Sequence, residues 1–230
     1  PMAGTVSERT IEALREFDSP TVMNAVERFA VRDRTAGYAN LDLQCLFPER
    51  APLVGYAFTA IADTTTPADP RPDRLTELFE RIAAAPQPSV YVVKHVGQDR
   101  LRSCFGGDMT ARALQHLGAA GMVTDGGVRD RAGIERRVPG FQLFAAGLVV
   151  SHGIPAIIDF DIPVEICGLT INPGDLLHGD ESGLLTIPAE IADRVPEQAQ
   201  AVLDVEAPLF ELLEREDVSL QEMLDAYHVH

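Results

Sequence analysis

Apolar side chains recur at helical or strand spacing along most of the chain. Between residues 7 and 28 they recur every three to five positions and are interrupted at Ser19-Pro20, which predicts two short helices, the second with Ser19 as its N-cap. Helical spacing also predicts helices at 75–82, 108–117 and 191–202, with kinks at Pro196 and Pro208. Alternating or continuous apolar runs predict strands at 55–62, 89–96, 120–124, 141–145, 154–160, 165–171 and 184–187. Segments without a sustained period, which predict loops, are residues 32–52 and 63–73.

The middle of the chain predicts a strand, a helix and a second strand in succession. Residues 89–96 are β-branched and nearly continuous, as in a strand that is buried on both faces. Gly106 and Gly107 then lead into the predicted helix, Gly118 ends it, and the next strand follows directly. This order is typical of an α/β fold with parallel strands. No internal repeat divides the sequence.

Composition limits the classes of partner. A chain of 230 residues with 46% hydrophobic residues can bury a substantial core, so we expect a single domain over residues 1–230. The 35 acidic residues outnumber the 19 basic ones, and a net charge of −16 would repel a phosphate backbone, which argues against nucleic acid as a partner. No window approaches 18 apolar residues, and no secretion leader is recognisable, so we expect a cytoplasmic protein without a membrane partner. The three separated cysteines are expected to be reduced.

Two glycines directly precede the helix predicted at 108–117. Free amides at a helix N-terminus attract anions, and glycine has no Cβ that would keep a ligand away. The run Phe105-Gly106-Gly107-Asp108-Met109-Thr110 is therefore a candidate site for a carboxylate or a phosphate. The alternative is an ordinary loop in which the Asp108 side chain caps the helix.

A second polar group follows at the end of the next predicted strand, in the run Asp125-Gly126-Gly127-Val128-Arg129-Asp130. A strand, a helix and a parallel strand bring both loops to one edge of the sheet, so we expect Asp108, Arg129 and Asp130 to converge. Asp130 offers hard oxygen ligands to Mg²⁺ or Mn²⁺, Arg129 offers a planar fork to a carboxylate or enolate, and Asp108 can hold a metal-bound water. The alternative is a surface ion pair at a helix start.

These motifs together resemble one known family. The matching runs are Gly106-Gly107-Asp108, the segment 119–130 (AAGMVTDGGVRD), Pro173-Gly174-Asp175 and the segment 179–183 (GDESG). Weaker similarity at 19–25 and 55–59 extends the resemblance over about residues 19–206, and the spacing from Asp108 to Arg129-Asp130 is its most specific element. The chain is similar to the RraA-like family, which contains 4-hydroxy-4-methyl-2-oxoglutarate/4-carboxy-4-hydroxy-2-oxoadipate aldolases and the regulator of ribonuclease activity A.

The resemblance implies a fold, an assembly and an activity. The fold would be one β/β/α domain of the swivelling phosphohistidine-like type, assembled as a homotrimer or hexamer with active sites between subunits. The activity would be that of a metal-dependent class II aldolase, a carbon–carbon lyase that cleaves a 4-hydroxy-2-oxo diacid to pyruvate and also decarboxylates oxaloacetate. Mg²⁺ is the expected cofactor, with Mn²⁺ and Co²⁺ as alternatives.

The resemblance also assigns roles to individual residues. Asp130 would anchor the metal, directly or through its waters, and Arg129 would contact the 2-oxo acid and steady its enolate. The amides from Gly107 to Thr110, including that of Met109, would hold the pyruvoyl carboxylate. Asp108 would lie beside a catalytic water, and Glu206 matches a glutamate that reaches in from the neighbouring subunit.

The sequence departs from the family pattern at two positions. Aldolase members usually carry an acid three residues after the metal aspartate, where this chain has Gly133, and the nearest acid is Glu135. Asn24 stands where an aspartate is common. Two other functions stay open. Lys94, the only lysine, allows a Schiff-base aldolase, and the acidic surface allows a non-catalytic regulator of ribonuclease activity that acts by protein–protein binding.

Overall fold

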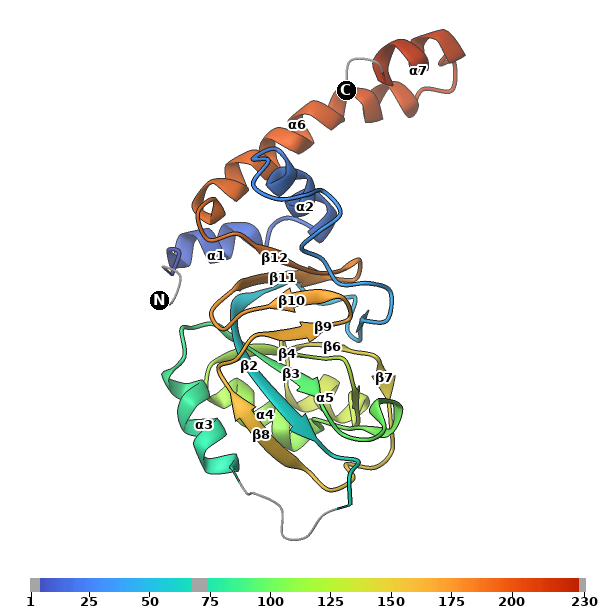
Figure 1. Cartoon of the computed structure of the whole chain (residues 1–230). Coiled ribbons are helices and arrows are strands. Elements are labelled where there is room, and N and C mark those ends of the chain that lie inside the picture. Colours follow the sequence, from blue (N-terminus) through green and yellow to red (C-terminus); the bar gives the residue numbers. More distant parts are fainter. Residues whose placement is uncertain (1–4, 68–73, 228–230) are drawn as a thin grey trace.

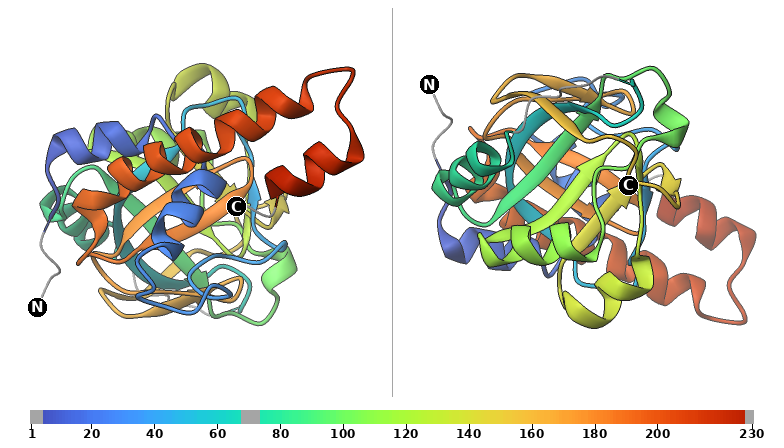
Figure 2. Two further views of the ribbon diagram at one scale, coloured as in Figure 1. Left: turned by 90° about the horizontal axis from the view of Figure 1, so that it is seen from above. Right: turned by 90° about the horizontal axis from the view of Figure 1, so that it is seen from below.

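The computed structural model describes residues 5–67 and 74–227, which form a mixed α/β fold around one large sheet (Figure 1). Part of the loop predicted at 63–73, residues 68–73, lies outside the described residues. The sheet has eight strands in the order β1-β6-β4-β3-β2-β11-β12, with β8 paired to β2. Viewed along a perpendicular direction, the strands curve into a nearly closed, barrel-like sheet (Figure 2).

Four parallel strands form the centre of the sheet, and antiparallel strands extend it. The parallel strands are β2 (Leu53–Asp63), β3 (Ser89–His95), β4 (Ala119–Thr124) and β6 (Gln142–Ala145). The antiparallel strands are β1 (Gln44–Cys45), β8 (Ala156–Phe160), β11 (Leu176–Asp180) and β12 (Gly183–Ile187). Two small pairs lie outside this sheet: β5 (Gly127–Val128) with β7 (Gly147–Leu148), and β9 (Val164–Ile166) with β10 (Leu169–Ile171).

Helices cover the sheet in two groups (Figure 1). Below it lie α3 (Leu75–Ala84), α4 (Asp108–His116) and α5 (Arg131–Arg137), with α4 between the other two. Above it lie α1 (Glu8–Leu14), α2 (Ser19–Glu27) and α6 (Val195–Leu213), and α7 (Leu220–Tyr227) continues beyond α6 away from the body. Two 3-10 turns, Arg100–Arg102 and Ala192–Arg194, complete the elements.

Buried apolar residues form three clusters around the sheet. One packs the lower helices against β2, β3, β4 and β6, and includes Leu78, Leu114 and Ile134. A second packs α1, α2 and α6 on β11, β12 and the start of β2. The third lies between the sheet and the β9–β10 hairpin. The first cluster matters most for function, because it fixes the helices that carry the polar loops.

Most predicted elements are confirmed. The two N-terminal helices, the helices at 75–82 and 108–117, and the strand-helix-strand unit of β3, α4 and β4 all occur, with β3 parallel to β4. The predicted strands at 55–62, 141–145, 154–160 and 184–187 correspond to β2, β6, β8 and β12. Cys45, Cys104 and Cys167 are free thiols, as predicted. None of the helices in the described ranges combines the length and apolar character needed to cross a bilayer.

Three local predictions are wrong. Asp18, not Ser19, caps α2: its carboxylate accepts the Thr21 amide at 2.8 Å, while the Ser19 hydroxyl bonds His178 Nδ1 at 3.0 Å. The strand predicted at 165–171 is the β9–β10 hairpin, because Cys167 (φ 48°) and Gly168 (φ 81°) turn the chain back. Pro196 does not kink a helix, since it lies in the first turn of α6, where its missing N–H is harmless. The helix continues through Pro208.

Candidate active site

The parallel pairing of β3 and β4 places the two glycine-rich loops beside each other. Three backbone hydrogen bonds join them: Gly127 N donates to Ser103 O (3.1 Å), Phe105 N to Gly127 O (3.1 Å) and Arg129 N to Gly106 O (2.9 Å). A side chain on Gly127 would approach Ser103 O to 2.6 Å, so only glycine permits this close contact. The chain segment that ends in Arg129 is thereby fixed against the segment that begins α4.

The N-terminus of α4 presents an open turn of amides. Gly107 is the N-cap, no side chain caps the helix, and Asp108 is its first residue. The alternative in which the Asp108 side chain caps the helix is therefore wrong, and the anion-site interpretation of this helix end is retained. Met109 in the same turn is 85% exposed. A carboxylate approaching this turn would meet the positive end of the helix dipole.

Arg129 and Asp130 lie directly beside this helix end. Arg129 Nε is 3.2 Å from Asp130 Oδ2, and both side chains are partly exposed. A Cβ added to Gly107 would lie 2.5 Å from Asp130 Oδ2 and 3.3 Å from Arg129 Nε. Asp130 adopts the left-handed conformation (φ 60°, ψ 29°), an uncommon state for a residue other than glycine and one that clusters at functional sites. The sequence prediction that Asp108, Arg129 and Asp130 converge is confirmed.

Arg137 is a residue of this region that the sequence interpretation missed. It comes from α5, which the apolar pattern did not predict and which only the ion-pair alternative for Arg129-Asp130 implied, and its Nη1 forms an ion pair with Asp108 Oδ2. Gly133, on the preceding turn of α5, faces the same carboxylate: a Cβ there would lie 2.8 Å from Asp108 Oδ2. The four-residue spacing of Ile134 and Val138, both buried, was the available signal for this helix.

The N-terminus of α4 and the Arg129-Asp130 pair border a cavity of about 590 Å³. Gly106, Gly107, Asp108, Met109, Thr110, Arg129 and Asp130 all line it. The rest of the lining comes from α3, α4, β2, β3 and β8, and from the loops that carry Thr64, Cys104, Phe105, His152 and Pro155. A second, shallower depression on the α5 side is bordered by Asp108, Asp130, Arg136 and Arg137. All candidate residues except Glu206 therefore gather around one concave surface.

The carboxylates suit a hard cation that keeps several waters. Among the described residues no group of three or more His, Cys, Asp or Glu side chains could hold a metal. Asp130 and Asp108 border the same cavity, and the glycine at 107 leaves open space beside Asp130 Oδ2. Mg²⁺ is commonly held by one or two carboxylates, water and substrate oxygens. The donor set fits such an ion.

Two further candidates lie elsewhere. Glu206 is on α6, above the sheet, whereas α4 and α5 lie below it, so one chain does not bring Glu206 to Arg129 (Figure 1). Lys94 Nζ is 2.7 Å from the buried Asp125 Oδ2. Lys94 is not among the residues that line the cavity. The Schiff-base alternative thus has no geometric support in this site.

Comparison with curated proteins finds relatives with and without an assigned activity. The chain is 27% identical to the uncharacterized protein MJ0644 of Methanocaldococcus jannaschii, over 54% of this chain and 59% of that protein. It is 34% identical to the 4-hydroxy-4-methyl-2-oxoglutarate aldolase of Thermus thermophilus, over 40% of this chain and 56% of the aldolase. The matches thus span little more than half of these relatives.

Solved structures and a family model cover more of the chain. An uncharacterized protein from Pseudomonas syringae superimposes with a TM-score of 0.76 over 99% of this chain and 97% of that one, at 22% identity. RraAS2 of Streptomyces coelicolor, described as an unusual member of the RNase ES inhibitor RraA family, superimposes with a TM-score of 0.68 over 88% and 97%, at 22% identity. These likenesses establish the fold. The model of the family described as RraA-like, Aldolase/RraA, matches residues 17–186. The chain therefore belongs to the RraA-like family.

Proposed function

We propose that this protein is a divalent-metal-dependent lyase that cleaves a 4-hydroxy-2-oxo acid and releases pyruvate, and that it also decarboxylates oxaloacetate. The observation that carries the proposal is the meeting of three features at one cavity: the uncapped N-terminus of α4, the Arg129 guanidinium and the Asp130 carboxylate. The names of aldolase relatives at about 30% identity support it.

The reaction breaks one carbon–carbon bond. In the retro-aldol reaction the C4 hydroxyl loses its proton to a base, the C3–C4 bond breaks, and C4 leaves as a carbonyl compound. The electron pair of the broken bond becomes the enolate of pyruvate, which then takes a proton at C3. In oxaloacetate the same bond breaks with loss of CO₂. Both reactions develop negative charge on the oxygen at C2, so a site that stabilises this charge accelerates both.

Each residue has a task in this scheme. The amides from Gly107 to Thr110 bind the carboxylate at C1 at the positive end of α4. The Arg129 guanidinium donates hydrogen bonds to the oxygen at C2 as charge develops there. Asp108 holds the water that accepts the hydroxyl proton. Asp130, assisted by Asp108, would hold the cation. A bound Mg²⁺, Mn²⁺ or Co²⁺ would act as a Lewis acid toward the 2-oxo group.

The assembly is part of the same proposal. We propose a homotrimer or hexamer of swivelling phosphohistidine-like domains in which Glu206 of a second copy completes the site. Glu206 lies on α6, and α6 extends away from the body of its own chain (Figure 1). A glutamate in that position is available to another copy rather than to its own Arg129.

The direct test measures pyruvate release from oxaloacetate and from 4-hydroxy-4-methyl-2-oxoglutarate, with Mg²⁺ or Mn²⁺ and with excess EDTA, at one protein concentration. We expect pyruvate from at least one substrate, and its loss in EDTA. Absence of pyruvate from both would contradict the proposal and favour the non-catalytic regulator. Full activity in EDTA, with inactivation by borohydride in the presence of substrate, would favour a Schiff base on Lys94.

A further inference from the structure

The cavity continues well beyond the charged groups. On the side of α4 that is remote from α5 it is bordered by α3, β2, β3 and β8. Most of the side chains there are apolar or aromatic: Leu75, Leu78, Phe79, Tyr91, Phe105, Pro155, Ala156 and Ile157. The polar side chains on this part of the lining are those of Thr64, Cys104 and His152. Cavities of several hundred Å³ with mainly apolar walls and a few polar groups are typical of small-molecule sites. Pyruvate alone would leave most of the 590 Å³ unfilled.

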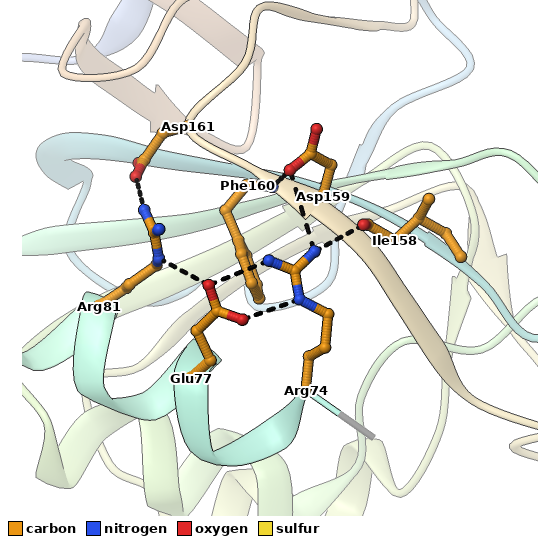
Figure 3. A network of polar contacts seen from close by, with 7 residues as sticks. All are labelled: Arg74, Glu77, Arg81, Ile158, Asp159, Phe160 and Asp161. Atoms are coloured by element: carbon orange, nitrogen blue, oxygen red, sulfur yellow. Dashed lines mark hydrogen bonds and ion pairs between the residues drawn. The ribbon is translucent and has the colours of Figure 1, made fainter. Parts of the chain in front are cut away.

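The apolar wall is held firmly by a polar network on its outer side. Arg74, at the start of α3, donates to Glu77 at 2.8 Å and to the Ile158 carbonyl of β8 at 2.6 Å. Arg81 donates to Asp161 at 2.6 Å, and the Arg74 guanidinium lies 4.4 Å from the Phe160 ring centre (Figure 3). The network fixes α3 against β8, so the two sides of the wall form one surface. A preformed wall costs little ordering entropy when a ligand binds.

The same network pairs the arginines of this region with acids, so that they are not available to a ligand in the cavity. Arg74 and Arg81 are both engaged by Glu77 and by the acids Asp159 and Asp161 of the β8 region (Figure 3). Among the described residues that line the cavity, Arg129 is the only arginine or lysine. Burial raises the pKa of the Tyr91 phenol and of the Cys104 thiol, so both stay neutral near pH 7. Among the described residues of the wall away from Arg129, His152 is therefore the only basic side chain, and no arginine or lysine is available there to a second carboxylate.

The depression on the α5 side is a poorer site for a second carboxylate. It is bordered by Arg131, Arg136 and Arg137, but Arg137 is already paired with Asp108, and Arg131 Nε donates to the Leu46 carbonyl at 2.8 Å. The apolar cavity is the better continuation of the site.

We propose that this cavity binds the C4 substituent of the substrate, and that the substituent is an aryl or branched alkyl group instead of a carboxylate. The inference rests on the proposed function and names its substrate class: a 4-hydroxy-2-oxo acid with an apolar group on C4. Cleavage of the C3–C4 bond then gives pyruvate and an apolar aldehyde or ketone, and the hydroxyl proton leaves C4 as in the retro-aldol scheme above.

Binding of uncleavable analogues separates this inference from catalysis. Pyruvate, 2-oxoglutarate and 2-oxo-4-phenylbutanoate share the 2-oxo acid head, and the two longer acids lack the 4-hydroxyl and so cannot undergo the retro-aldol reaction. Calorimetric titration in Mg²⁺ should show 2-oxo-4-phenylbutanoate binding about tenfold or more tightly than pyruvate, because burial of a phenyl-sized group shifts affinity by this much. 2-Oxoglutarate should bind no more tightly than pyruvate.

A charge placed on the wall should invert this preference. Leu75 is the first residue of α3, lines the cavity and is 48% exposed, so Leu75→Arg is compatible with folding. We expect Leu75→Arg to weaken the binding of 2-oxo-4-phenylbutanoate about tenfold and to strengthen the binding of 2-oxoglutarate. The affinity for pyruvate should stay unchanged. Leu220→Arg is the matched control, because Leu220 is an exposed leucine at the first position of α7. Ala113→Phe, which fills the cavity from α4, should weaken only the phenyl compound.

The outcomes distinguish the inference from the proposed function. The inference is overturned if the unmodified protein binds 2-oxoglutarate as tightly as 2-oxo-4-phenylbutanoate, or more tightly. It is also overturned if Leu75→Arg and Ala113→Phe both keep the preference of the unmodified protein for 2-oxo-4-phenylbutanoate. Pyruvate release from 4-hydroxy-4-methyl-2-oxoglutarate would still support the lyase in that case. Conversely, the protein could bind 2-oxo-4-phenylbutanoate tightly but release pyruvate from no substrate, including 4-hydroxy-2-oxo-4-phenylbutanoate. That result would support the apolar binding site and contradict the proposed lyase activity.

Discussion

Asp108 and Gly133 face each other between α4 and α5, so closely that a methyl group on residue 133 would lie 2.8 Å from Asp108 Oδ2 and 3.2 Å from its Cγ. Arg137, one turn further along α5, pairs with the same carboxylate. Aldolase members of the family usually carry an acid where this chain has Gly133. Here the Asp108 carboxylate occupies the space that the side chain of such an acid would enter, and the positively charged partner on α5 is Arg137.

Gly133→Ala should therefore impair catalysis without unfolding the protein. The added methyl forces Asp108 to turn, and we expect kcat/KM for pyruvate release to fall about tenfold or more, since small displacements of a reacting group have effects of this size. Alanine also favours helix formation by about 1 kcal/mol over glycine, which offsets part of the steric cost in α5. Steady-state kinetics and urea unfolding measure the two effects.

A double-mutant cycle tests whether the effect passes through Asp108. Removal of Arg137 frees the carboxylate to move, so Gly133→Ala combined with Arg137→Ala should be less impaired than the sum of the single changes. Arg136→Ala is the matched control, since Arg136 is the neighbouring exposed arginine of α5. Strict additivity in the cycle would contradict the coupling of Gly133 to Asp108.

Asp130→Asn should remove both turnover and metal dependence. The amide keeps the shape of the side chain but loses the charge that would attract the cation, so we expect pyruvate release to fall at least about a hundredfold. Asp217→Asn is the control, because Asp217 also pairs with an arginine, Arg215, and does not line the cavity. If Asp130→Asn released pyruvate at the unmodified rate, Asp130 would have no part in the mechanism.

The sequence predicted correctly those features that depend on residues close together along the chain. The apolar periods of β3, α4 and β4, with glycines at the bends, predicted the strand-helix-strand unit and hence the convergence of Asp108 with Arg129. The helix α5 was not predicted from apolar spacing because it has only seven residues and follows Asp130, whose left-handed conformation no residue type indicates. Arg137 was missed with it.

The apolar end of the cavity was beyond prediction for a different reason. Its wall combines α3 with β8, and β8 pairs antiparallel with β2 rather than following it in the chain. Nothing in the local pattern of residues 75–84 or 156–160 specifies that pairing. The same holds for Cys167, whose positive φ converts a predicted strand into a hairpin. Contacts between distant segments decide these features.

Lys94→Met should destabilise the protein rather than abolish its chemistry. Asp125 is buried, and its Oδ2 lies 2.7 Å from Lys94 Nζ while Oδ1 accepts the His95 amide at 2.8 Å. Loss of the lysine leaves a buried carboxylate without its counter-charge, at a cost of about 3 kcal/mol. Urea unfolding should show this loss, and adding Asp125→Asn should restore part of the stability. An unchanged free energy of unfolding in Lys94→Met would mean that the ion pair does not stabilise the fold.

His178 should make the stability fall in mild acid. The side chain is fully buried between α2 and β11: Nε2 donates to the Leu14 carbonyl at 3.1 Å, and Nδ1 accepts the Ser19 hydroxyl at 3.0 Å. Desolvation lowers the pKa of His178 below its ordinary value, so the folded protein holds the neutral ring. The unfolded chain binds a proton near pH 6.5, which means that this contribution is complete above about pH 6.5 and is lost as the pH falls below it.

Urea unfolding between pH 7.5 and pH 5 isolates this contribution when the protein is compared with His178→Gln. Many carboxylates titrate toward the lower end of this range in both proteins, so only the difference between the two slopes reports on His178. The unmodified protein should lose up to about 1.4 kcal/mol more per pH unit below pH 6.5. Parallel curves for the two proteins would mean that His178 accepts a proton in the folded state as readily as in the unfolded chain, and that its two hydrogen bonds do not hold it neutral.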